Sequence, residues 1–180
     1  MVASAQLALV LPKRWAHVQG VSVRAEQSAR LFDTDDREML LAAALLHDIG
    51  YAPGVAHTGF HPYDGARYLK SIKASERLCA LVAHHSCAYV EAELRGLSAE
   101  LAGWRDEQTP VRDALWWADM TTTPEGKVTN VHDRIEEIQK RYGAENIVTL
   151  FIRQAKAEIV ASVERTESRL REAGIDYTAK

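Results

Sequence analysis

Cysteine is scarce in this chain of 180 residues. Only Cys79 and Cys87 are present, too few for the disulfide framework that stabilises many secreted domains. We therefore expect free thiols in a reducing compartment, and so a cytoplasmic protein. A chain of this length can bury one hydrophobic core without covalent crosslinks.

The chain also lacks a strong excess of charge and a long apolar run. Its formal net charge is -3, whereas nucleic-acid-binding domains are typically basic, so no nucleic-acid polymer is expected as a partner. No apolar run reaches the roughly 18 residues that span a bilayer. Residues 3–11 are apolar, but no basic region precedes them, so we expect neither a signal peptide nor a membrane partner.

Two-residue alternation of apolar and polar side chains is absent, and so are internal repeats. Apolar residues instead recur at helical spacing, which predicts an all-α fold. We expect a single domain over residues 1–180, with a motif-bearing core at about 10–125 and C-terminal helices at 130–173. Helices are expected over residues 7–32, 33–47, 61–73, 75–86, 89–97, 99–104, 111–120, 130–142 and 145–173.

Several residues indicate where these helices begin. Pro12 marks a start or a kink, and Thr109-Pro110 is a start signal. Asp35 and Glu38 have the spacing of a capping pair. Trp116 and Trp117 are expected to pack in the core.

A histidine and a carboxylate, His47 and Asp48, directly follow the apolar run at residues 39–46. An unpaired charge buried there would cost several kcal/mol, so something must compensate Asp48. A divalent metal would do so, because imidazole and carboxylate are both ligands of first-row metals. Alternatively, the pair caps a helix end, with Gly50 as a left-handed stop.

Further histidines stand on or beside otherwise apolar faces of predicted helices, as suits ligands that converge in a helical bundle. Neither His57, in a loop, nor His132, late in the chain, is expected to be a ligand. The candidate ligands are His17, His47, Asp48, His61, His84, His85 and Asp119.

The order of these residues resembles the HD-domain superfamily of metal-dependent phosphohydrolases. Its most specific part here is LLHDIGY at residues 45–51. Arg14-Trp15-Ala16-His17 resembles the histidine motif of the first helix, His61-Pro62 followed by Gly65-Ala66 resembles the HPxxG segment, and Ala118-Asp119 resembles the closing aspartate.

The resemblance implies one HD domain with a metal site in its core. His17, His47, Asp48 and Asp119 would hold one divalent ion (Mn, Fe, Co, Mg or Ni). The fuller set resembles members that bind two ions, with Asp48 as the bridge. Adjacent histidines on a helix point about 100° apart, so His84 and His85 could share an ion only near a helix end, and whether one or both are ligands stays open.

Two divalent ions against two carboxylates leave a formal charge of about +2, which suits a phosphate ester. The resemblance thus implies hydrolysis of a small phosphate ester, a nucleotide or a related metabolite, by a metal-activated water, with His47 and Asp48 as catalytic residues. Arg24, Tyr51 and Lys127 are candidates for substrate binding. The alternatives are a surface arginine, a packing tyrosine and an ordinary polar loop at 121–127.

Some departures from the family pattern narrow the function. Members that cleave cyclic di-GMP carry a lysine where this chain has Tyr51, and a GYP segment that is missing here, so that activity is not expected. A mixed-valent di-iron oxygenase shares the ligand pattern and is the first rival. The second rival is a non-catalytic ligand-sensing module.

Overall fold

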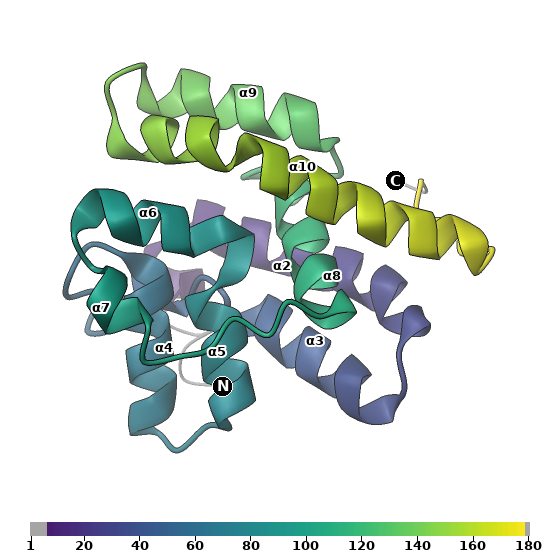
Figure 1. Ribbon diagram of the computed structural model, residues 1–180, viewed down its shortest axis with the longest axis horizontal. Coiled ribbons are helices and arrows are strands. Elements are labelled where there is room, and N and C mark those ends of the chain that lie inside the picture. Colours follow the sequence, from purple (N-terminus) through teal and green to yellow (C-terminus); the bar gives the residue numbers. More distant parts are fainter. Residues whose placement is uncertain (1–6, 179–180) are drawn as a thin grey trace.

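The computed structural model describes residues 7–178, so the beginning of the apolar stretch at residues 3–6 lies outside it. The fold is all-α (Figure 1), as the sequence predicted, and within the described residues the only β-type pairing is an isolated bridge between Thr122 and Val128. The α-helices and short 3-10 helices (η) are α2 (Pro12–Ser28), η1 (Ala29–Leu31), α3 (Thr34–Leu46), η2 (Ile49–Tyr51), α4 (His61–Ser71), α5 (Glu76–Ala83), η3 (His85–Cys87), α6 (Ala88–Arg95), α7 (Ser98–Leu101), α8 (Pro110–Met120), α9 (Val131–Tyr142) and α10 (Ile147–Glu172).

Local sequence fixes where the helices begin. Pro12 occupies the first turn of α2, so the predicted helix over residues 7–32 is interrupted at Leu11. The cap of α3 is Asp33, whose carboxylate accepts the backbone N–H of Asp36 at 3.0 Å. The predicted capping pair of Asp35 and Glu38 was therefore wrong by two residues. Thr109 caps α8 as expected.

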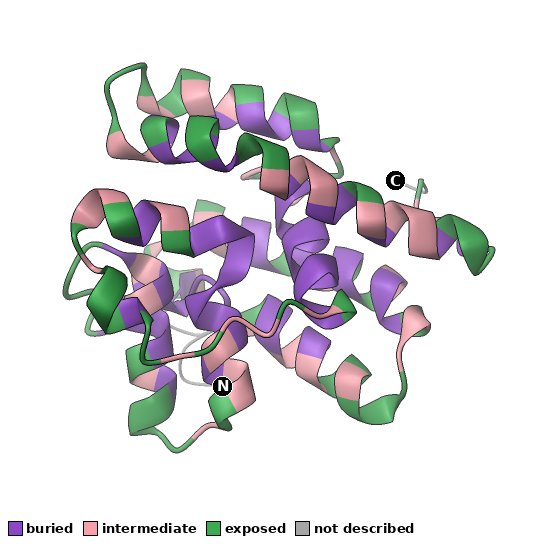
Figure 2. Cartoon of the chain, in the orientation of Figure 1, coloured by how far each residue is buried: buried purple, intermediate pink, exposed green. Residues whose placement is uncertain are grey.

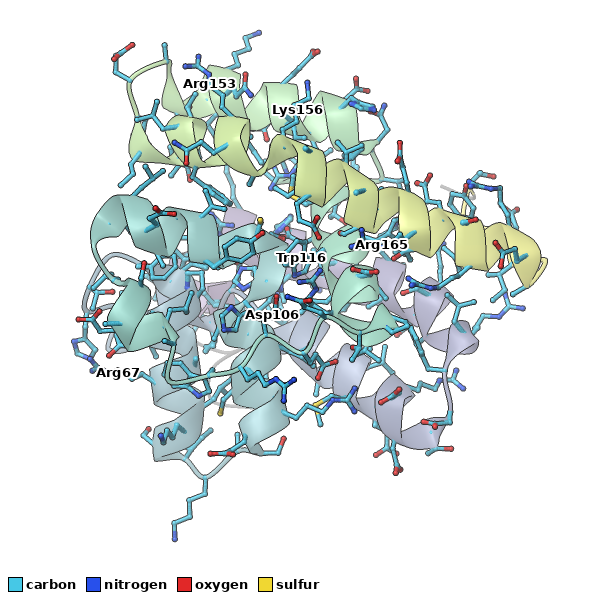
Figure 3. The ribbon with its side chains drawn as sticks, in the orientation of Figure 1. Arg67, Asp106, Trp116, Arg153, Lys156 and Arg165 are labelled. Carbon is cyan, nitrogen blue, oxygen red and sulfur yellow. The ribbon has the colours of Figure 1, made fainter. Side chains whose placement is uncertain are left out.

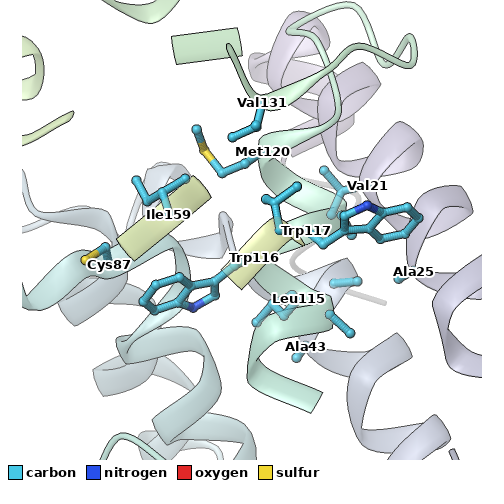
Figure 4. Close-up of a cluster of buried hydrophobic side chains, with 14 of the residues drawn as sticks. Val21, Ala25, Ala43, Cys87, Leu115, Trp116, Trp117, Met120, Val131 and Ile159 are labelled. Carbon is cyan, nitrogen blue, oxygen red and sulfur yellow. The ribbon is translucent and has the colours of Figure 1, made fainter. Parts of the chain in front are cut away.

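Helix α8 runs through the centre of the molecule. All of its residues from Val111 to Met120 are buried (Figure 2), and it packs against α2, α3 and α10. Trp116 and Trp117 are fully buried, which confirms their predicted place in the core (Figure 4). Burying one large apolar side chain stabilises a fold by roughly 1.5–3 kcal/mol, so this helix is a firm support for Asp119 in its last turn.

Helices α9 and α10 form a hairpin on one side of the molecule (Figure 1), where α10 packs against α8, α9 and α6. Ion pairs between a buried aspartate and two partly exposed arginines join α10 to α8. Asp113 of α8 accepts two hydrogen bonds from Arg165, both at 2.8 Å, and one from Arg169 at 3.1 Å (Figure 3 labels Arg165). Of the described helices, none combines the length and the apolar character that crossing a lipid bilayer requires.

Candidate metal centre

Residues far apart in the sequence meet at the ends of several helices. The imidazole rings of His17 and His47 lie 5.6 Å apart, those of His47 and His85 5.2 Å, and those of His61 and His85 5.0 Å, measured between ring centroids. Asp119 joins them, since its Oδ1 lies 3.0 Å from Nε2 of His17. The cluster draws its members from α2, the end of α3, the start of α4, η3 and the last turn of α8.

Asp48 lies in the middle of this cluster and is buried. Its Oδ2 is 3.4 Å from Nε2 of His47, and its Oδ1 is 3.3 Å from Nε2 of His61. The possible ligand atoms thus form two groups that share Asp48: one with His17 and His47, the other with His61 and His85. In each group, these atoms lie within 4.8 Å of one another. The shared carboxylate is placed to serve two ions at once.

Backbone carbonyl groups fix the tautomers of three of the histidines. The Nδ1 atoms of His47 and His85 each lie 2.7 Å from a carbonyl oxygen, that of Ala44 and that of Val82 respectively. The Nδ1 atom of His17 lies 3.0 Å from the Thr123 carbonyl oxygen. A carbonyl oxygen can only accept, so each Nδ1 carries the hydrogen, and in the neutral ring Nε2 presents a lone pair to the cluster.

These lone pairs face other acceptors, and this is the observation that a metal would explain. Nε2 of His17 faces the carboxylate of Asp119, and Nε2 of His85 lies 3.0 Å from Nε2 of His61. Nε2 of His47 is buried without a hydrogen-bond partner. Groups this close need protons or a metal ion between them, and nitrogen with carboxylate oxygen is the donor set of first-row divalent metals. The residues therefore fit a divalent ion.

The pKa values show how the cluster is balanced when no ion is bound. Burial works to raise the pKa of Asp48 and of Asp119, but cationic and hydrogen-bonding neighbours outweigh it and hold both well below their usual range. For His47, burial lowers the pKa and Asp48 raises it, with a result of about 9. Burial holds the pKa values of His61 and His85 below the usual value, so these two rings are neutral and free to act as ligands.

Close backbone contact brings Asp48 to His61. A Cβ atom on Gly50 would lie 1.9 Å from the carbonyl oxygen of His61, so only glycine allows η2 to touch the start of α4. The φ angle of Gly50 is not positive, which argues against the alternative of a left-handed stop at this residue. The glycine is needed here for space.

The chain reverses sharply after the two adjacent histidines. Helix α5 ends at Ala83, and Ser86 and Cys87 have φ angles of 48° and 65°, in the left-handed region that non-glycine residues rarely adopt. His85 turns into the cluster, whereas Nε2 of His84 lies 2.8 Å from the Trp104 carbonyl oxygen. The structure does not bring His84 to the other candidate ligands.

We predict that substitutions of His84 and of His85 have different effects on the amount of bound metal. His85→Gln should lose the ion that the group of His61 and His85 would hold, whereas His84→Gln should keep full occupancy, because only a bond to a backbone carbonyl is lost. Elemental analysis of the two purified variants checks this. Equal loss of metal in both would contradict the separation.

The strained turn also places a residue that sequence reasoning missed. The hydroxyl group of Ser86 donates to Oδ2 of Asp119, while Oδ1 faces His17. Both oxygens of this carboxylate are thereby oriented. Nothing in the sequence around Ser86 indicates a left-handed conformation, so no local signal could have revealed it.

Two predicted substrate-binding residues lie elsewhere. Arg24 is buried, stacks over Trp117 at 3.9 Å and donates to the Tyr177 carbonyl oxygen at 2.6 Å. Lys127 is exposed and borders a surface groove that it shares with Arg24. Neither lines the cavity at the metal cluster, so the structure places both away from a substrate bound there. Arg24 instead stabilises the packing of the C-terminal segment.

Tyr51, the third candidate, does line that cavity. Its ring stacks on His61 with the centroids 4.1 Å apart, and the Arg14 guanidinium lies 4.1 Å from its centroid on the ring face. Arg14 in turn donates to Oδ2 of Asp48 at 2.8 Å. Sequence reasoning gave Arg14 no role, although its place three residues before His17 put it on the same helix face.

The loop after Asp119 supports the cluster from outside. It is closed by hydrogen bonds between Thr123 and Lys127, and it presents the Thr123 carbonyl to His17. Its backbone touches α2, because a Cβ atom on Gly126 would lie 2.3 Å from the Ala16 carbonyl oxygen. The loop therefore orients His17, and its Lys127 does not line the cavity.

We expect Gly126→Ala to weaken metal binding, because the added carbon would push the Thr123 carbonyl away from His17. Loss of such a supporting hydrogen bond typically lowers metal affinity about 10–100-fold. The matched control is Gly174→Ala, at a glycine that also has a positive φ but open space around the new carbon. Metal titration of both chelator-treated variants measures the effect, and equal affinities would refute it.

A cavity of about 230 Å³ opens on the cluster. Asp48, His61, His85 and Asp119 line one part of it. Four arginines from α2, α6 and α9 line other parts: Arg14, Arg95, Arg134 and Arg141. Apart from Arg14, none of them is near a recognisable motif, so the sequence alone gave no reason to single them out.

Comparison with known families shows what this arrangement belongs to. The family described as HD domain matches residues 14–138, well over half of the chain and every residue of the cluster. Comparison with curated proteins gives no match, and comparison with solved structures gives none either. HD domains bind divalent metals and indicate a superfamily of metal-dependent hydrolases. On this match, and in agreement with its all-α fold and its histidine and aspartate cluster, the chain belongs to the HD-domain family.

Proposed function

We propose that this protein is a metal-dependent phosphohydrolase that cleaves a small phosphate ester. The observation that carries the proposal is the set of arginines on the cavity beside the candidate ligands. Arginine keeps its charge at any physiological pH and matches the oxygens of phosphate with its planar donors. A cavity that combines metal ligands with several arginines favours a phosphorylated substrate.

Arg14 is the arginine best placed to connect substrate and metal ligands. One of its nitrogens donates to Asp48, and a guanidinium has five N–H groups in all, so others are available to a phosphate oxygen. Arg134 adds a second guanidinium: its side chain is almost fully buried, its Nη1 is paired with Glu137, and its Nε has no hydrogen-bond partner and is available to a ligand. Arg141 lies on the same helix, α9, is more exposed and also lines the cavity.

A divalent ion bound by these residues would supply an activated water and an electrophile for the phosphoryl oxygens. The chain's own groups prepare the site for that ion. Asp48 stays ionised because its pKa is held low, and Ser86 and His17 hold the two oxygens of Asp119. Burial raises the pKa of Tyr51 above its usual value, so its phenol stays protonated and can donate a hydrogen bond to the substrate.

A screen of phosphate esters with metal-loaded protein tests the proposal. We expect phosphate release that stops when a chelator is added. Arg141→Gln should raise KM while leaving metal content unchanged. The control is Arg153→Gln, because Arg153 is exposed on α10 (Figure 3) and does not line the cavity. Fully metal-loaded protein that releases no phosphate from any ester would refute the proposal.

A further inference from the structure

Part of the cavity lining forms an apolar wall, which comes from the end of α8 and from the α9–α10 hairpin, whose α9 also carries Arg134 and Arg141. We infer that the organic group of the substrate is itself compact and apolar, an alkyl or aryl group, and lies against this wall while the phosphate faces the arginines. The inference rests on the proposed function, because it assigns the organic group of the phosphate ester. The apolar residues of the wall are Met120, Ile138, Val148, Phe151 and Ile152.

These side chains are held firmly. Phe151 is 7% exposed and Ile152 2%, and the ion pairs of Asp113 with Arg165 and Arg169 fix α10 against α8. A preformed apolar surface at a binding site gains free energy by removing apolar ligand area from water. A ligand that offers only a phosphate would leave this surface unused.

The same cavity has few uncharged groups that could bind a sugar. Its uncharged hydroxyl groups belong to Tyr51, Ser86 and Tyr142, and that of Ser86 is already bonded to Asp119. Glu91 and Arg95 are hydrogen bonded to each other at 2.7 Å. The hydroxyl groups of a sugar would lose water here and find few uncharged partners, and they would gain nothing from the apolar wall.

The size of the cavity supports the inference, and the apolar wall lies largely outside the residues that the HD-domain family matches. Pockets for drug-sized ligands measure roughly 300–1,000 Å³, so about 230 Å³ suits a phosphate with a compact group. The HD-domain match ends at residue 138, whereas Val148, Phe151 and Ile152 follow it. The apolar part of the wall is thus largely built by α10, a helix outside the matched range.

Two phosphonates separate the organic group from the chemistry, because a P–C bond is not hydrolysed. Benzylphosphonate and methylphosphonate would be titrated into the metal-loaded protein by calorimetry. We expect benzylphosphonate to bind at least about tenfold more tightly, as burial of a ring predicts. Phe151→Ala should remove most of this difference without weakening methylphosphonate. Leu150→Ala, at an exposed position on the same helix, should change neither.

Equal binding of the two phosphonates would overturn the inference, as would a Phe151→Ala variant that weakens both alike. If Phe151→Ala does not fold, Val148→Ala, less deeply buried, provides the same comparison. Turnover is measured separately with benzyl phosphate and glycerol 3-phosphate, both esters of a primary alcohol, and we expect kcat/KM to be at least about tenfold higher for the former. Selective phosphonate binding by a metal-loaded protein that hydrolyses no ester of the screen would refute the proposed function and leave the apolar binding site standing.

Discussion

Asp48→Ala is expected to lose nearly all bound metal, whereas His61→Ala should weaken mainly one of two sites. The reason is geometric: Asp48 belongs to both groups of candidate ligands, and His61 belongs to one. Removal of the shared carboxylate also takes away the negative charge that offsets the ions. Elemental analysis of the two variants, purified in the presence of Mn²⁺, gives the comparison directly.

The control for this experiment is Asp64→Asn. Asp64 is also buried, but its Oδ2 accepts the backbone N–H groups of His57 and Thr58, both at 2.9 Å, and it stands outside the cluster. An asparagine oxygen can accept the same bonds, so this variant should retain its metal. Full metal occupancy in Asp48→Ala would contradict the role of Asp48 as a shared ligand.

Metal affinity should rise by about tenfold per pH unit from pH 7 to about pH 8.5, because binding releases a proton. In the metal-free protein, the pKa of His47 is raised to about 9, so its ring is protonated at pH 7. An ion needs the lone pair of Nε2 and must displace that proton. Above about pH 9 the proton is already gone, and the affinity should level off.

The direction in which folding stability changes with pH follows from the same histidine, His47. The usual pKa of histidine is about 6.5, so the raised value stabilises the metal-free fold below that pH, and this stabilisation is lost as the pH rises through about 9. In the metal-bound protein the rise in metal affinity offsets this loss, so its stability should change little over this interval. Calorimetry of metal binding at pH 7, in buffers of different ionisation enthalpy, counts the protons that binding releases. A count near zero would show that His47 is not displaced from a charged state.

Sequence reasoning identified much of the candidate centre because its residues are marked locally. His47 and Asp48 follow an apolar helix, and His61 stands before a proline that starts the next helix, so helix ends could be located from these signals. It failed where a backbone conformation departs from what its residues favour. Ser86 and Cys87 adopt positive φ without being glycine, and this turn decides that His85, and not His84, faces the cluster.

The position of Arg24 away from the cavity at the cluster has a different cause. Arg24 shares a helix face with His17, but its partners, the Thr121 hydroxyl and the Tyr177 carbonyl, come from distant segments that only the folded chain reveals. The apolar wall depends in the same way on Asp113 pairing with arginines more than 50 residues later. Helical periodicity predicts that α10 has an apolar face, and it does not predict what that face covers.

The central claim is that the cluster holds divalent ions for hydrolysis of a phosphate ester, and an anaerobic assay tests it most directly. Chelator-treated protein would be reloaded with Mn²⁺ and given an ester that it cleaves in air, with oxygen strictly excluded. Since attack by water needs no oxidant, we predict phosphate release at an undiminished rate. Turnover that stops without oxygen, together with a mixed-valent iron signal in electron paramagnetic resonance and oxygen consumption by the iron-loaded protein, would contradict the account and indicate a di-iron oxygenase.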